Sequence, residues 1–158
     1  MFAGDAESRV SIRRKYDFSI SSKCRTLLIQ CIDYRFQTGI RNFMISQGYQ
    51  DEYDVVSVSG AGKYLVESGV EREILFDEIR ISQQLHNISE VFIVHHLDCG
   101  AYGGSNAFPT VQNEKARHMQ DLGVIQARIK EKFPVLVVHT VIARLEADGN
   151  KVDFEKVA

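Results

Sequence analysis

Four short apolar runs are the feature of this sequence that most restricts its fold. They cover residues 26–32, 54–58, 91–95 and 135–139. The first run, Thr26–Ile32, is nearly continuous rather than alternating. That pattern is typical of a parallel strand buried on both faces. The segments between the runs must therefore supply the helices that cover the sheet.

Helical patterns fill these intervals. Apolar side chains recur at spacings of three and four in residues 38–47, 70–85 and 114–132, which indicates amphipathic helices. Asn113 is the predicted N-cap of the third helix. The predicted inward stripe of that helix consists of Met119, Leu122, Ile125 and Ile129.

The C-terminal part of the chain has the pattern of a hairpin. Strand-like segments at residues 141–146 and 151–154 flank Asp148-Gly149, a strong turn signal. Together the patterns predict an α/β fold, with a mostly parallel sheet of four to five strands flanked by helices and the hairpin as its antiparallel edge. No linker divides the chain, so we expect an N-terminal arm over residues 1–23 and one domain over residues 24–158.

Composition excludes several classes of function. The net charge of -2 argues against nucleic-acid binding. No apolar run approaches the roughly 20 residues that span a bilayer, and the N-terminus lacks the apolar segment of a secretory signal. Three cysteines cannot all pair within one chain. We therefore expect thiols or metal ligands in a reducing cytoplasm, with no membrane partner.

Reactive residues follow three of the predicted strands. The first strand leads into Cys31-x-Asp33-x-Arg35, the second into Ser59-Gly60-Ala61-Gly62, and the third into His96-x-x-Cys99-Gly100. Right-handed crossovers place these strand ends at one edge of the sheet. Two thiolates and one imidazole suit zinc, and three protein ligands leave a position open for catalysis.

These motifs resemble those of the β-class carbonic anhydrases, and the resemblance extends over about residues 24–155. It implies one Zn²⁺ per subunit, held by Cys31, His96 and Cys99, with Asp33 and Arg35 as an ion-paired dyad beside the metal. The implied reaction is the reversible hydration of carbon dioxide to bicarbonate by zinc-bound hydroxide. The resemblance also implies a homodimer or homotetramer.

The residues are consistent with that chemistry. Zinc lowers the pKa of a bound water, and Asp33 is placed to accept the hydroxide proton and aim the oxygen. Arg35 would keep Asp33 ionised through two hydrogen bonds, although the pair is also open to a purely structural interpretation. In the family, the counterpart of Asp33 can instead swing onto the metal. Because two thiolates cancel the charge of zinc, we expect a less acidic water than at a three-histidine site.

The chain departs from the family around the substrate pocket. Tyr34 stands where many relatives have Ser, and residues 59–62 stand where Arg-Asn-Ala-Gly is frequent. Two alternatives stay open: hydrolysis of carbonyl sulfide or carbon disulfide, and a catalytically silent zinc protein. A phosphate loop is disfavoured because Ser57 and Tyr64 break its pattern. The candidate pocket residues are Tyr34, Gly60, Ala61, Gly62, Gly100 and Tyr102.

The remaining cysteine and the other histidines receive simpler interpretations. His95 should point away from His96 and pack or form a hydrogen bond. Asp98 is interpreted as a turn residue that can also orient His96 or Arg35. Cys24 is expected to be inert. We expect His86, His118 and His139 at the surface or at helix ends, any of them a candidate proton shuttle.

Overall fold

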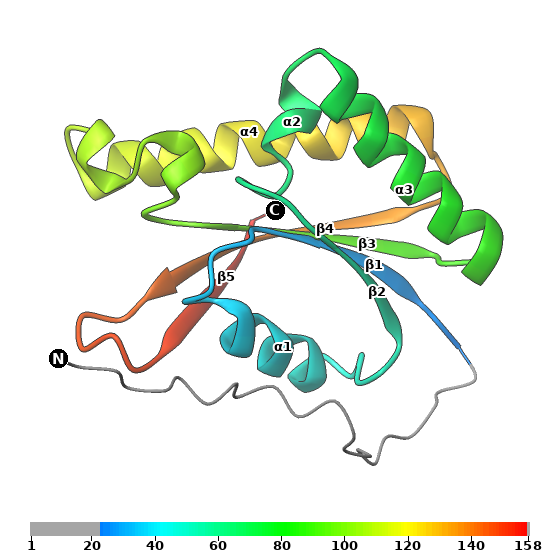
Figure 1. Cartoon of the computed structure of the whole chain (residues 1–158), viewed down its shortest axis with the longest axis horizontal. Helices are drawn as coiled ribbons and strands as arrows, with labels where there is room; N and C mark the ends of the chain where they lie inside the picture. The colour runs from blue at the N-terminus through cyan, green and yellow to red at the C-terminus, as the bar shows by residue number, and fades with distance from the viewer. Residues whose placement is uncertain (1–22, 158) are drawn as a thin grey trace, which may run out of the picture.

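The computed structural model describes residues 23–157, which form one five-stranded sheet with helices on both faces (Figure 1). The spatial order of the strands is β2-β1-β3-β4-β5. The first four strands are parallel, and β5 is antiparallel to β4, so the predicted α/β fold with an antiparallel edge is confirmed. The strands are β1 (Thr26–Gln30), β2 (Tyr53–Ser57), β3 (Glu90–His96), β4 (Val137–Leu145) and β5 (Val152–Val157).

The helices divide unequally between the two faces (Figure 1). Helix α1 (Gln37–Ser46) lies on one face beside β5, where Phe43 stacks on Phe154 with ring centroids 4.6 Å apart. The opposite face carries α2 (Lys63–Val66), α3 (Val70–His86) and α4 (Val111–Lys132). Two short 3-10 turns, η1 (Gly100–Tyr102) and η2 (Ser105–Ala107), connect β3 to α4.

Alternation along the central strands builds two apolar cores. Leu27 and Ile29 of β1 belong to the cluster that includes the α3 and α4 side chains. Leu28, between them, belongs to the cluster that includes Ile40 and Met44 of α1. Successive strand residues point to opposite faces, and both faces of β1 are covered. This double coverage is why the first run of the sequence is continuously apolar.

The structure corrects two boundaries. The predicted fourth strand and the first arm of the predicted hairpin are one continuous strand, β4. Helix α4 begins before the predicted Asn113 cap, with Thr110 as the actual N-cap. The Thr110 Oγ1 atom accepts a hydrogen bond of 3.1 Å from the Asn113 backbone N–H. Asn113 therefore lies in the first turn, because the extended backbone at Thr110 places the earlier hydroxyl over the free N–H groups.

The predicted stripe of α4 is correct for three of its four members. Leu122, Ile125 and Ile129 are fully buried, but Met119 is 42% exposed. His118 and Asp121 are buried in its place. The buried face of α4 is thus rotated relative to the predicted one, and it places polar side chains toward the sheet.

Two expectations concern the ends of the chain and membranes. The predicted N-terminal arm, residues 1–23, falls outside the described residues except for Lys23. Among the helices in residues 23–157, none combines the length and apolar character that a membrane crossing needs.

Candidate metal centre

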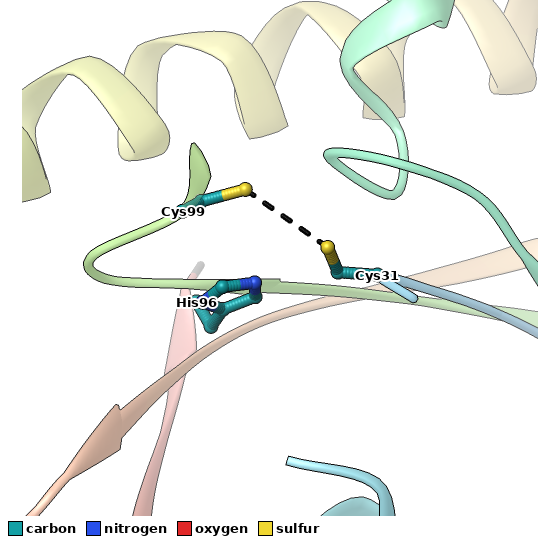
Figure 2. A group of neighbouring side chains, drawn as sticks. All are labelled: Cys31, His96 and Cys99. Atoms are coloured by element: carbon teal, nitrogen blue, oxygen red, sulfur yellow. Dashed lines mark hydrogen bonds between the residues drawn. The ribbon is translucent and has the colours of Figure 1, made fainter. Parts of the chain in front are cut away.

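Three soft donors meet where β1 and β3 end side by side (Figure 2). Cys31 follows β1, His96 is the last residue of β3, and Cys99 lies three residues further along. Their ligand atoms all lie within 4.8 Å of one another, and the two Sγ atoms are 4.0 Å apart. Two zinc–sulfur bonds at a tetrahedral ion would hold the sulfurs about 3.8 Å apart. The pair therefore has the spacing that a zinc ion requires.

The loop after β3 is shaped by its own backbone and by the carboxylate of Glu114. Asp98 has a φ of 57°, which turns the chain sharply before Cys99. The Cys99 carbonyl then accepts hydrogen bonds from the N–H groups of Tyr102 and Gly104. Buried Glu114 of α4 accepts from the Asp98 N–H at 2.6 Å and from the Ser105 hydroxyl at 2.7 Å. These contacts fix the loop against α4 and hold the Cys99 thiol toward Cys31 (Figure 2).

The His96 ring is oriented as a metal ligand. Its Nδ1 lies 2.8 Å from the Leu97 carbonyl oxygen, which can only accept a hydrogen bond, so Nδ1 carries the proton. Nε2 then presents a lone pair. It is buried and has no hydrogen-bond partner among the described residues. A buried polar atom without a partner is unfavourable, and a metal ion beside the two sulfurs would satisfy it. The donor set therefore fits zinc.

The two thiols are electrostatically coupled. A hydrogen bond from Cys99 lowers the pKa of Cys31 well below its ordinary value, and His96 and the Gly60 N–H, 3.4 Å away, act in the same direction. The same hydrogen bond, burial and the charge on Cys31 raise the pKa of Cys99. Two thiolates this close are therefore unfavourable without a cation. A divalent ion would compensate the charge of both as thiolates.

Asp33 and Arg35 form a close ion pair beside this cluster. The Arg35 Nε atom donates to both Asp33 oxygens at 3.1 Å, and Nη2 donates to Oδ2 at 2.7 Å. These hydrogen bonds lower the pKa of Asp33. Arg35 also donates to Asp98 Oδ2 at 2.9 Å, so it bridges the loops that follow β1 and β3. Asp33 Oδ2 is 3.9 Å from His96 Nε2, which places the ionised carboxylate at the cluster.

A cavity of about 620 Å³ opens onto the cluster. Cys31, Asp33 and Arg35 line it together with three of the expected pocket residues: Tyr34, Gly60 and Gly100. The other three expected pocket residues, Ala61, Gly62 and Tyr102, are not part of its wall. Ala61 is fully buried, Gly62 faces Ile125 and Ile93, and the Tyr102 hydroxyl donates to Asp121 at 2.8 Å. Tyr34 is 85% exposed and stands at the rim.

A buried histidine pair behind the centre was missed by the sequence analysis. His95 packs and forms a hydrogen bond, as expected, and its Nδ1 lies 3.2 Å from Nδ1 of His118. The expectation that His118 lies at the surface or at a helix end is wrong, because it is fully buried. Burial lowers the pKa of His118 to about 4 and also lowers that of His95. The signal was available, since His118 precedes Leu122 by four residues and Ile125 by seven.

The other two histidines pair with carboxylates. His86 ends α3, as expected, and its Nδ1 lies 2.7 Å from Asp54. His139 is half-buried in β4, where its Nε2 lies 2.6 Å from Glu90.

Comparison with known proteins agrees with this fold. Residues 21–144 match the family model described as "Putative carbonic anhydrase". The chain belongs to this carbonic anhydrase family. An uncharacterized protein of Rickettsia conorii is 35% identical over 130 residues, covering 79% of this chain and 70% of that protein. An uncharacterized protein of Rickettsia bellii is 34% identical and covers 79% of each chain.

Crystal structures of other carbonic anhydrases have a fold similar to that of this carbonic anhydrase family member. A β-carbonic anhydrase of Trichomonas vaginalis superposes with a TM-score of 0.60 at 11% identity, covering 90% of this chain and 87% of that one. A carbonic anhydrase of Streptococcus mutans superposes with a TM-score of 0.50 at 17% identity, covering 92% and 88% of the two chains. The β-carbonic-anhydrase-like fold expected from the sequence motifs is confirmed.

Proposed function

We propose that this protein is a zinc-dependent carbonic anhydrase that catalyses the reversible hydration of carbon dioxide to bicarbonate. The observation that carries the proposal is the buried Cys31–His96–Cys99 cluster, whose imidazole Nε2 has no partner among the described residues. Family membership supports the reaction class. The three cysteines are free thiols, which supports a cytoplasmic location.

Each residue of the centre has a role that follows from its contacts. Cys31, His96 and Cys99 would hold the zinc, which when bound acts as a Lewis acid that makes hydroxide available near neutral pH. Asp33 would accept a hydrogen bond from an O–H group at the open side of the cluster, which orients the lone pair of that oxygen. Arg35 keeps that carboxylate ionised and fixed in direction.

The cavity suits a small apolar substrate. Beside the polar dyad, its wall includes Ile32 and Ala101, and Gly60 and Gly100 add no side-chain bulk. Carbon dioxide needs little more than a close approach to the nucleophile. The wall also leaves room for carbonyl sulfide, so the substrate is decided by assay.

We also propose that the protein is a homodimer or homotetramer. Ile32 is 58% exposed at the cavity and Val55 is 51% exposed on β2, one of the two edge strands of the sheet. An exposed apolar edge strand is a surface that proteins cover. Sedimentation equilibrium on the full chain tests this, and a monomer at micromolar concentration would contradict it.

The proposed reaction is tested by stopped-flow carbon dioxide hydration on protein of measured zinc content. We expect Cys99→Ser to lose both zinc and activity. Asp33→Asn should retain zinc and lose about 10²-fold in kcat/KM, because the oxygen nucleophile is no longer oriented. Asp153→Asn, an exposed carboxylate paired with Arg144, is the matched control and should be unchanged.

Three outcomes would contradict the proposal. Zinc-loaded wild type no faster than Asp33→Asn would make the protein a silent zinc protein. Sulfide release from carbonyl sulfide without carbon dioxide hydration would make it a hydrolase on the same scaffold. Full activity of Cys99→Ser would exclude the cluster as the centre.

A further inference from the structure

A second group of metal-type donors lies at the opposite end of the sheet. Cys24 precedes β1, Asp54 is in β2 and His86 is the last residue of α3. One donor atom from each lies within 4.8 Å of the other two, as in the Cys31–His96–Cys99 cluster. The two groups are separated by the length of the parallel strands, because Cys24 stands before β1 and Cys31 after it.

We infer that Cys24, Asp54 and His86 form a second binding site for a zinc-like divalent cation. The inference does not depend on the proposed activity. A thiol, an imidazole and a carboxylate are the three ligand types that zinc takes in proteins. Calcium and magnesium prefer sites made of oxygen alone, so the thiol and the imidazole disfavour them.

Asp54 is held as a metal ligand often is, by a hydrogen bond from a residue that would not itself contact the ion. Its Oδ2 atom lies 2.7 Å from His86 Nδ1 and also accepts a hydrogen bond from the Ser82 hydroxyl. An ion between Asp54 and His86 would replace their direct hydrogen bond and leave Ser82 holding the carboxylate. Such outer hydrogen bonds orient metal ligands. Ser82 is buried, so this support is fixed within α3.

The thiol is available on the same side. Cys24 is half-buried, and its Sγ donates a long hydrogen bond of 3.6 Å to the Thr26 carbonyl oxygen. A cavity of about 750 Å³, lined by all three donor residues, gives an ion and its remaining water ligands access from solvent. Three protein ligands and water complete the coordination that zinc takes at open sites.

A comparison within the chain shows what the thiol adds. His139 and Glu90 form an equally short imidazole–carboxylate pair, 2.6 Å apart. Within residues 23–157 that pair belongs to no group of three metal-type donors, and Glu90 is already engaged by Tyr49 at 2.7 Å.

An ion at the Cys24 site would join the start of β1 to β2 and to the end of α3. Binding only the folded chain, it would stabilise the fold.

Cobalt titration tests the site on the full chain. The protein has three cysteines, so in Cys31→Ser/Cys99→Ser a cobalt–thiolate charge-transfer band can come only from Cys24. We expect that variant to bind one Co²⁺ with this band. Adding Cys24→Ser should abolish the band, and adding His86→Ala should weaken binding at least tenfold. Adding His139→Ala, the matched control, should leave binding unchanged.

A second measurement covers a double variant that does not fold. Wild type should then bind two Co²⁺ per chain and Cys24→Ser one, each with native circular dichroism. Equal stoichiometry in these two proteins, or no thiolate band in a folded double variant, overturns the second site. Neither result bears on carbon dioxide hydration, so failure of this inference and failure of the proposed activity are distinguishable.

Discussion

Arg35 has two acidic partners, and their contributions should differ greatly. Its several hydrogen bonds to Asp33 join half-buried groups, whereas Asp98 is 53% exposed and meets Arg35 through Nη1 at 2.9 Å. Exposed ion pairs contribute about 0–1 kcal/mol. We therefore expect Asp98→Asn to lower kcat/KM by less than about fivefold. Arg35→Lys should lower it by about 10²-fold, because lysine cannot hold Asp33 with two parallel hydrogen bonds.

Stopped-flow hydration on metal-verified variants measures both losses. Zinc content should equal that of wild type in Asp98→Asn and Arg35→Lys, since neither residue supplies a donor atom to the cluster. A loss as large for Asp98→Asn as for Arg35→Lys would show that the dyad depends on the outer carboxylate.

His118 should make the protein sensitive to mild acid. Burial lowers its pKa from 6.5 in the unfolded chain to about 4 in the fold. Well above pH 6.5 the ring is neutral in both states and does not make the free energy of unfolding depend on pH. As the pH falls from 6.5 to 4, His118 is protonated in the unfolded chain but stays neutral in the folded chain, so the free energy of unfolding declines. The loss is on the order of 3 kcal/mol and is complete below pH 4.

Urea unfolding at several pH values measures this effect. His118→Gln removes the titrating ring, so the slope of unfolding free energy against pH between 6.5 and 4 should be shallower than in wild type. The comparison uses slopes, and a lower absolute stability of the variant does not affect it. Equal slopes in wild type and His118→Gln would show that His118 is not the source of the acid sensitivity.

At the scale of elements, alanine substitutions at two glycines, one packed against α4 and one within it, should have opposite effects on stability. A Cβ at Gly62, before α2, would lie 2.8 Å from Ile125 Cδ1 and 2.9 Å from Ile93 Cγ2. Gly62→Ala should therefore destabilise the protein by about 1–3 kcal/mol through overpacking. At Gly123, exposed in the middle of α4, such a Cβ would have no atom within 4 Å apart from its chain neighbours and the backbone of its own helix. Gly123→Ala should stabilise by about 0.4–1 kcal/mol.

Urea midpoints for the two alanine variants check this pair. Both substitutions add the same methyl group. The backbone φ of Gly62 is −75° and Gly123 is helical, so alanine fits the backbone conformation at both positions. A stabilising Gly62→Ala would mean that α2 can move away from the sheet.

Element types were predictable because burial imposes periodicity, while element ends were not. Several polar residues near the start of α4 are equally compatible with an N-cap or a first turn. In the structure Thr110 is the N-cap. The buried face of α4 was misjudged for a related reason. Met119 is apolar but exposed, whereas His118 is polar but buried against His95. Hydropathy alone does not mark His118 as buried, and the signal lies instead in its helical spacing to Leu122 and Ile125.

For the whole molecule, topology made the candidate site predictable. Parallel strands joined by right-handed crossovers put the ends of β1 and β3 side by side, which brings together residues 31 and 96. The second cluster escaped the same reasoning. Cys24, Asp54 and His86 meet at the other ends of the strands, where a helix terminus supplies one donor. Strand-end motifs alone do not reveal such a meeting.

Metal removal should lower the stability of the whole fold, because both clusters join elements distant in sequence. Free zinc at about 1,000 times its dissociation constant stabilises a site by about 4 kcal/mol. For a chain of this size, that corresponds to a rise in Tm of at least about 8 °C. Differential scanning calorimetry with zinc and with chelator measures the rise. Cys31→Ser/Cys99→Ser should lose the larger part, since its cluster is fully buried. Cys24→Ser should lose a smaller part, and a Tm independent of zinc in wild type would contradict both sites.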